Sequence, residues 1–178
     1  MGIDVYLKWD NQTEAENQAQ YTGFSTVAGS VGYLREAYHG SPYATHALFP
    51  RPYWEITEEE SEAGGKLADI AELKDRLAQA VLVATFRNHV LYEQGTDPSY
   101  AEIGDIAGKL AKVFADMDNG RGQTDDVIAR ITPEQVAQVE VLIEARKLPG
   151  YALAFVDFVR LAEKLAAEGR NPRVYISY

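Results

Sequence analysis

IDVYLKW at residues 3–9 is the stretch that decides the fold. Its apolar residues occupy every second position: Ile3, Val5, Leu7 and Trp9. Asp4, Tyr6 and Lys8 lie between them. A period of two is typical of a β-strand with one buried face. The chain therefore opens with a strand whose apolar face packs on a core.

The sequence RVYISY at residues 173–178 repeats the pattern near the other end of the chain. Val174, Ile176 and Tyr178 alternate with more polar residues. A lone strand leaves its backbone N–H and C=O groups without partners, so two short strands satisfy each other by pairing. We therefore predict that the first and last segments pair in one small sheet.

Apolar residues between these strands recur at helical spacing, which predicts four main helices. The first begins near Leu67 and extends past Ala84. The second opens at Asp97-Pro98, and the third at Thr132-Pro133, where Gln135 completes a capping box. The fourth covers about residues 151–168. The expected fold class is therefore α+β and predominantly α, with the four helices packed against the small sheet.

The length of 178 residues predicts a single domain over residues 1–178. Within it we distinguish a strand plus an aromatic-rich irregular segment at residues 1–54, an acidic loop at 55–65, a helical core at 66–169 and the terminal strand at 173–178. Thr13 and Glu16 form a capping box that opens a short helix, and residues 23–32 are expected to be a loop.

Residues 31–38 are compatible with a helix or a strand. Ser30 before them, Gly40 after them and the helix formers Arg35, Glu36 and Ala37 favour a helix. Ser41-Pro42 predicts the N-cap and first position of another short helix.

The composition excludes several classes of protein. With 17 basic and 27 acidic residues the net charge is −10, which argues against nucleic-acid binding because that needs a basic face. No cysteine is present, so disulfide scaffolds and thiolate zinc sites are excluded. We see neither a signal peptide nor a membrane-length apolar run, and therefore expect a cytoplasmic protein without a membrane partner.

The densest collection of aromatic, basic and ionisable residues lies at residues 31–54, VGYLREAYHGSPYATHALFPRPYW. Aromatic rings give large, rigid contact area, and histidine titrates near neutral pH. The residues that we expect to bind a ligand or partner are Tyr33, Arg35, Tyr38, Tyr43, His46 and Trp54. Glu36 and His39 are the candidate acid/base pair. The alternative is that this segment only clamps an irregular stretch of chain onto the helices.

Glu36 and His39 also form a Glu-x-x-His pattern, which on a helix suits di-metal carboxylate sites. Such sites need a second copy and further carboxylates, and the sequence contains no second copy. We therefore expect no metal site and no cofactor.

GIDVYLKWD together with GYLREAYHGSPYATHALF resembles a family of small uncharacterised bacterial and phage proteins. The likeness covers mainly the first fifty residues, and it implies no activity, site or mechanism.

The leading functional hypothesis is a non-enzymatic, soluble binding or interaction protein that uses residues 33–54. One alternative is a small-molecule enzyme with Glu36 and His39 as acid/base groups and Arg35 as anion clamp. A further alternative is an acidic, immunity-type antagonist of a basic protein.

Overall fold

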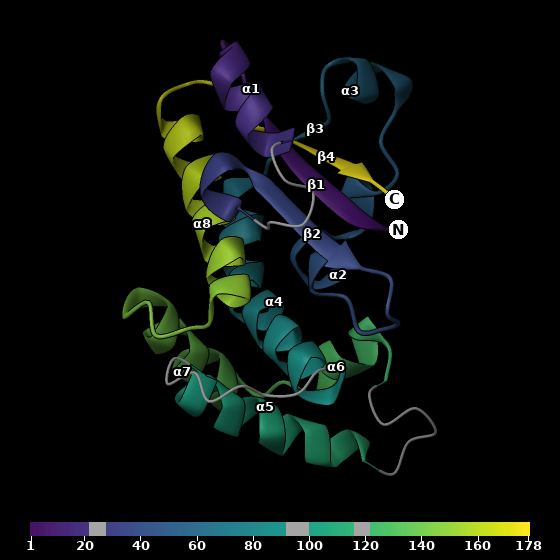
Figure 1. The fold of residues 1–178 in the computed structure, drawn as a ribbon, viewed down its shortest axis with the longest axis vertical. Helices are drawn as coiled ribbons and strands as arrows, with labels where there is room; N and C mark the ends of the chain where they lie inside the picture. Colours follow the sequence, from purple (N-terminus) through teal and green to yellow (C-terminus); the bar gives the residue numbers. More distant parts are fainter. Residues whose placement is uncertain (22–27, 92–99, 116–121) are drawn as a thin grey trace. The chain divides into compact units, whose positions relative to one another are not determined.

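The computed structural model describes residues 1–21, 28–91, 100–115 and 122–178 (Figure 1). The fold is α+β, with helices predominating and one antiparallel sheet. The chain forms two compact units. The first unit contains residues 1–38, 49–75 and 154–178, and the second contains residues 39–48 and 76–153. The single domain expected from the length stays a prediction, since two compact units can still unfold as one cooperative domain.

The sheet belongs to the first unit and has the strand order β2-β1-β4-β3. Its strands are β1 (Gly2–Lys8), β2 (Tyr33–Ala37), β3 (Lys66–Leu67) and β4 (Arg173–Ser177). β1 pairs antiparallel with β4, with Tyr6 opposite Tyr175. The predicted pairing of the two end segments is therefore confirmed, and two further strands enlarge the sheet.

The helix that we favoured for residues 31–38 is wrong, because Tyr33–Ala37 form the strand β2. This segment pairs antiparallel with β1, with Tyr33 opposite Tyr6 and Arg35 opposite Asp4. Helix propensity is a weak preference that tertiary contacts override, and here pairing with β1 satisfies the backbone groups of the segment.

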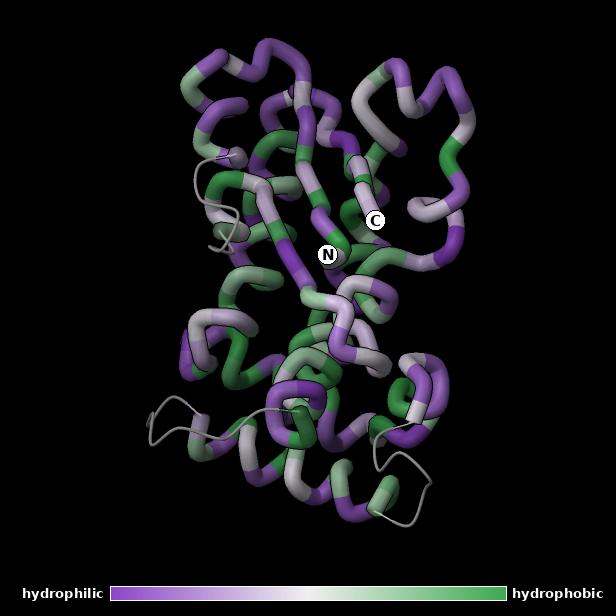
Figure 2. The backbone as a smooth tube through the Cα atoms, turned by 45° about the vertical axis from the view of Figure 1, so that its right-hand side comes forward, coloured by the Kyte–Doolittle hydropathy of each residue, from purple (hydrophilic) through white to green (hydrophobic). Residues whose placement is uncertain are grey.

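Alternation gives the sheet two unlike faces, and hydrophilic and hydrophobic residues alternate along β1 in Figure 2. The core face carries apolar side chains that are almost fully buried: Ile3, Val5, Leu7, Leu34, Val174 and Ile176. The outer face carries the residues between them, including Asp4, Tyr6, Tyr33 and Arg35.

Two helices of the first unit lie next to the sheet (Figure 1). In α1 (Glu14–Tyr21) the predicted capping box is present, because the Thr13 N–H donates to Glu16 Oε2 at 2.8 Å and the Glu16 N–H donates to Thr13 Oγ1 at 3.2 Å. α8 (Gly150–Ala167) enters the unit from Ala154 onward. Its Phe158 is fully buried and packs edge to face on Phe49 at 5.6 Å.

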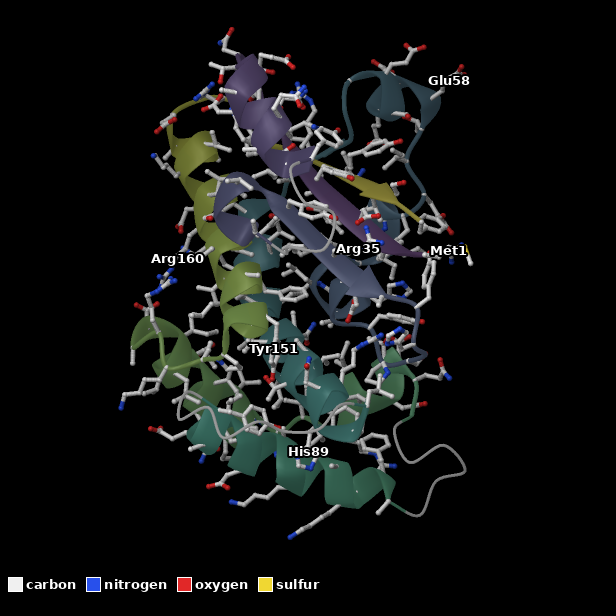
Figure 3. The ribbon with its side chains drawn as sticks, in the orientation of Figure 1. Met1, Arg35, Glu58, His89, Tyr151 and Arg160 are labelled. Atoms are coloured by element: carbon white, nitrogen blue, oxygen red, sulfur yellow. The ribbon has the colours of Figure 1, made fainter. Side chains whose placement is uncertain are left out.

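Residues 55–65, expected to be an acidic loop, contain the short helix α3 (Glu58–Glu62). Thr57 and Glu60 form a capping box at its start, and this motif stabilises even a single turn. Glu58 extends outward at α3 in Figure 3. The short 3-10 turns η1 (Gly29–Val31) and η2 (Arg51–Tyr53) complete the first unit.

The second unit is helical, and its elements are α2 (Ala44–Leu48), most of α4 (Ile70–Leu91), α5 (Ala101–Phe114), α6 (Thr124–Arg130) and α7 (Pro133–Glu144). α2 begins two residues after Pro42, so the N-cap predicted at Ser41 is wrong. The Thr132–Gln135 capping box is present at the start of α7. The helix start expected at Asp97-Pro98 and the first half of the loop expected at residues 23–32 lie outside the described residues.

None of the described helices combines the length and the apolar character needed to cross a membrane.

Candidate functional site

Two of the expected ligand-binding residues, Tyr33 and Arg35, meet on the outer face around Asp4. The Tyr33 hydroxyl donates to Asp4 Oδ1 at 2.7 Å, and Arg35 Nη1 lies 3.2 Å from the same oxygen. Burial, followed by the hydrogen bond to Asp4, raises the pKa of Tyr33 to about 12. Arg35 extends from the sheet in Figure 3. This cluster joins β1 to β2 as cross-strand pairs do.

Glu36 lies on the other face of β2, opposite Ile3, and is only 8% exposed. Successive side chains of a strand point to opposite faces, so Arg35 and Glu36 cannot act on one group from adjacent positions. Tyr38 and His39 are both exposed, and His39 belongs to the second unit. The structure therefore does not bring Arg35 and Glu36 together.

Tyr43 and His46 belong to the second unit, where their rings lie 5.3 Å apart. Arg87 of α4 is almost fully buried and fastens this part of the segment. Its Nη1 donates to the carbonyl oxygens of Gly40 and Pro42 at 2.9 and 2.7 Å, and its guanidinium lies 4.6 Å from the centre of the Tyr43 ring. These contacts fit a structural clamp, with a cation–π contribution.

Trp54 contributes to the first unit. Its indole N–H donates to the Phe49 carbonyl at 2.7 Å, and its ring lies 5.6 Å from that of Tyr178. The candidate residues are thus distributed over both units. Within the described part of the chain, no group of three or more metal-ligating side chains is brought together.

The first unit contains a pocket of about 320 Å³ that the sequence did not indicate. We call it the Trp9 pocket. Its lining residues come from the end of β1, from α1, from η1 and from α8: Trp9, Ala15, Glu16, Ala19, Ser30, Val31 and Leu161. Pockets that bind small molecules combine apolar walls with a few polar groups, and this lining has that character.

Gln20 and Gly29 hold the walls of the Trp9 pocket in place. The Gln20 amide donates to the carbonyl oxygens of Leu7 at 2.7 Å and Val31 at 2.9 Å, which ties α1 to β1 and η1. Gly29 lies against the backbone of α8, where an added Cβ would come 1.8 Å from the Ala154 carbonyl oxygen. The approach of η1 to α8 therefore depends on the absence of a side chain.

Two of the polar groups in the lining of the Trp9 pocket, the Trp9 indole N–H and the Glu16 carboxylate, are neighbours. The Trp9 indole N–H is buried, and among the described residues it has no hydrogen-bond acceptor. The pKa of the half-buried Glu16 carboxylate is lowered, chiefly because the Thr13 N–H donates to it. The Trp9 indole N–H faces this carboxylate and lowers its pKa slightly further, but it does not reach hydrogen-bond geometry with it. A buried N–H without a partner costs about 1–3 kcal/mol, so a ligand that accepts from it recovers that free energy.

The second unit contains a groove of about 360 Å³ between α5 and α7, lined by Ile106, Val141 and Leu142 and by polar residues such as Glu102 and Lys109. Its charged side chains lie in solvent, where Glu102 is 3.7 Å from Lys147. Exposed ion pairs of this kind contribute little free energy, and none of the described residues that line this groove has a buried polar side-chain atom without a partner. The Trp9 pocket is therefore the better candidate site.

No family model, no curated protein and no solved structure matches this chain.

Proposed function

We propose that this chain is a non-enzymatic binding protein and that the Trp9 pocket is its small-molecule site. The observation that carries the proposal is the buried Trp9 indole N–H, which has no acceptor among the described residues and lies at the wall of a mostly apolar pocket. Buried polar groups in proteins are nearly always hydrogen-bonded, and exceptions call for an explanation. A bound molecule that accepts this hydrogen bond supplies one.

The arrangement favours binding over catalysis. An acid/base enzyme needs a second titratable group within reach of the reacting atoms. The described lining of the Trp9 pocket contains one carboxylate, that of Glu16, and no histidine, lysine or arginine. The enzyme alternative with Arg35, Glu36 and His39 loses support, because Arg35 and Glu36 lie on opposite faces of β2.

The binding role of residues 33–54 and the antagonist of a basic protein stay predictions. Exposed Glu58 and Glu59 on α3 and the net charge of −10 support the latter. A cytoplasmic location is also part of the proposal, supported by the absence of cysteine.

Nuclear magnetic resonance of the Trp9 indole N–H tests the pocket. Trp9 and Trp54 are the two tryptophans of the chain, so a Trp54→Phe variant assigns the two indole signals. Titration with propylbenzene and 3-phenyl-1-propanol should shift the Trp9 signal in a saturable way and leave the Trp54 signal in place.

Filling the pocket provides the control. Ala19→Leu adds a side chain at the lining and should abolish the shift, whereas Ala137→Leu on the exposed side of α7 should leave it unchanged. If neither probe moves the Trp9 signal, the proposed function is wrong.

A further inference from the structure

The polar groups of the Trp9 pocket restrict what kind of molecule fits it, an inference that rests on the function proposed above. Trp9 offers one N–H donor and no acceptor. The Glu16 carboxylate offers only acceptors, and Thr13 engages its Oε2 through both the backbone N–H at 2.8 Å and the hydroxyl at 3.1 Å. Its Oε1 is therefore the oxygen that remains for a donor on a ligand.

A ligand that satisfies both groups needs an acceptor and a donor on neighbouring atoms. A hydroxyl group provides both on one oxygen, and a primary amide provides both on adjacent atoms. An ammonium group has no lone pair to accept from Trp9. A carboxylate has no proton to donate, and Glu16 repels it in a chain of net charge −10.

The remaining lining residues and the volume of the pocket restrict the size and polarity of the rest of the ligand. Ala15, Ala19, Val31 and Leu161 present apolar surface, and Ser30 lies among them. A volume of about 320 Å³ is near the lower end of the range for small-molecule sites. The body is therefore compact and apolar, of the size of one ring with a short chain.

We infer that the Trp9 pocket binds a neutral, compact apolar molecule that ends in a hydroxyl or primary amide, with this end group bridging Trp9 Nε1 and Glu16 Oε1. The indole N–H donates to the oxygen of the end group, and the end group donates its own proton to the carboxylate.

Calorimetric titration of the full chain with four matched probes tests this ligand class. The probes are 3-phenyl-1-propanol, propylbenzene, 3-phenylpropylamine and 3-phenylpropanoate at neutral pH. A hydrogen bond to a charged group and a second to a buried donor should make the alcohol bind at least about tenfold tighter than the other three probes.

Two variants assign the preference to the two side chains. Trp9→Phe keeps an aromatic wall but removes the donor, so the alcohol should lose most of its advantage over propylbenzene. Glu16→Gln keeps the capping box and an acceptor oxygen but removes the negative charge. The Glu16→Gln variant should bind 3-phenylpropanoate several-fold more tightly than the unaltered chain does and still prefer the alcohol to propylbenzene.

The possible outcomes distinguish a failure of the proposed function from a failure of the proposed ligand class. Absence of binding by all four probes overturns the proposed function together with the ligand class. Equal binding of all four, or an alcohol preference that survives Trp9→Phe, leaves the pocket as a site and overturns the bridging end group. Tighter binding of the amine or the carboxylate overturns the neutral ligand class.

Discussion

Gly29→Ala should destabilise the protein strongly, because η1 and α8 touch backbone to backbone at this position. The added Cβ would lie 1.8 Å from the Ala154 carbonyl oxygen and 2.9 Å from the Phe158 backbone nitrogen. Real Cβ atoms essentially never approach closer than 3.0 Å, and the difference between 3.0 and 1.8 Å, 1.2 Å, is the smallest displacement that relieves the clash. No side chain can rotate away, because both contacts are to backbone atoms.

This displacement of η1 lowers the free energy of unfolding further. Overpacking typically costs about 1–3 kcal/mol, and moving η1 also strains the hydrogen bond of 2.9 Å from Gln20 to Val31 and the longer one of 3.3 Å to Gly32. Adding about 1 kcal/mol for each of these bonds gives a loss of roughly 3–5 kcal/mol in the free energy of unfolding. For a chain of this length that corresponds to a fall in Tm of roughly 6–20 °C.

Urea unfolding followed by circular dichroism measures this loss. Gly150→Ala is the matched control, since an added Cβ there meets nothing within 4 Å. The control should change the free energy of unfolding by less than about 1 kcal/mol, in the stabilising direction. A Gly29→Ala protein within about half a kcal/mol of the unaltered chain would refute the close approach and the pocket wall that depends on it.

Three further substitutions test other contacts. Gln20→Leu removes the donor to three backbone carbonyls and should cost about 2–3 kcal/mol in urea unfolding, whereas Gln18→Leu on the exposed side of the same helix should cost little. Leu110→Ala should cost about 2–5 kcal/mol because this α5 side chain is only 1% exposed, and a loss below about half a kcal/mol would contradict its burial. Folding raises the pKa of Tyr33 from 10.0 to about 12, so the protonated Tyr33 hydroxyl stabilises the folded state. This contribution to the free energy of unfolding is fully present below pH 10 and is lost as the pH rises through 12. Tyr33→Phe should therefore flatten the decline of unfolding free energy over that interval, and an unchanged slope would contradict the raised pKa.

The parts of the fold that local sequence signals specify were predictable. Alternation in residues 3–9 identified β1, and the same alternation near the other end identified its partner β4. Thr13 with Glu16 and Thr132 with Gln135 marked two helix starts correctly. In each case the interaction involves residues close in sequence or a pattern that only one secondary structure satisfies.

Residues 31–38 could not be assigned because their local and long-range preferences conflict. Arg35, Glu36 and Ala37 favour a helix in isolation, but pairing with β1 and the contacts of Tyr33 and Arg35 with Asp4 favour a strand. The helix α3 could have been predicted from the sequence, because Thr57 and Glu60 have the spacing of a capping box within an acidic run.

The Trp9 pocket had no signal in the sequence. Its walls come from segments far apart in the chain, which only the folded structure brings together. The absence of an acceptor for the Trp9 N–H is a property of the packed structure, not of the sequence. Conversely, the dense aromatic segment was conspicuous in sequence, yet Phe49 and Tyr53 are core residues.

β4 lies between β1 and β3, so two of the strand pairings in the sheet depend on the strand that comes last in the sequence. While the chain emerges from the ribosome, β1 is made first, and the strand that covers one of its edges is made after all the helices. Until β4 pairs with it, that edge of β1 presents unpaired backbone N–H and C=O groups, which can pair with any other extended chain. We expect a chain that is cut before Arg173 to keep this edge of β1 unpaired and therefore to self-associate.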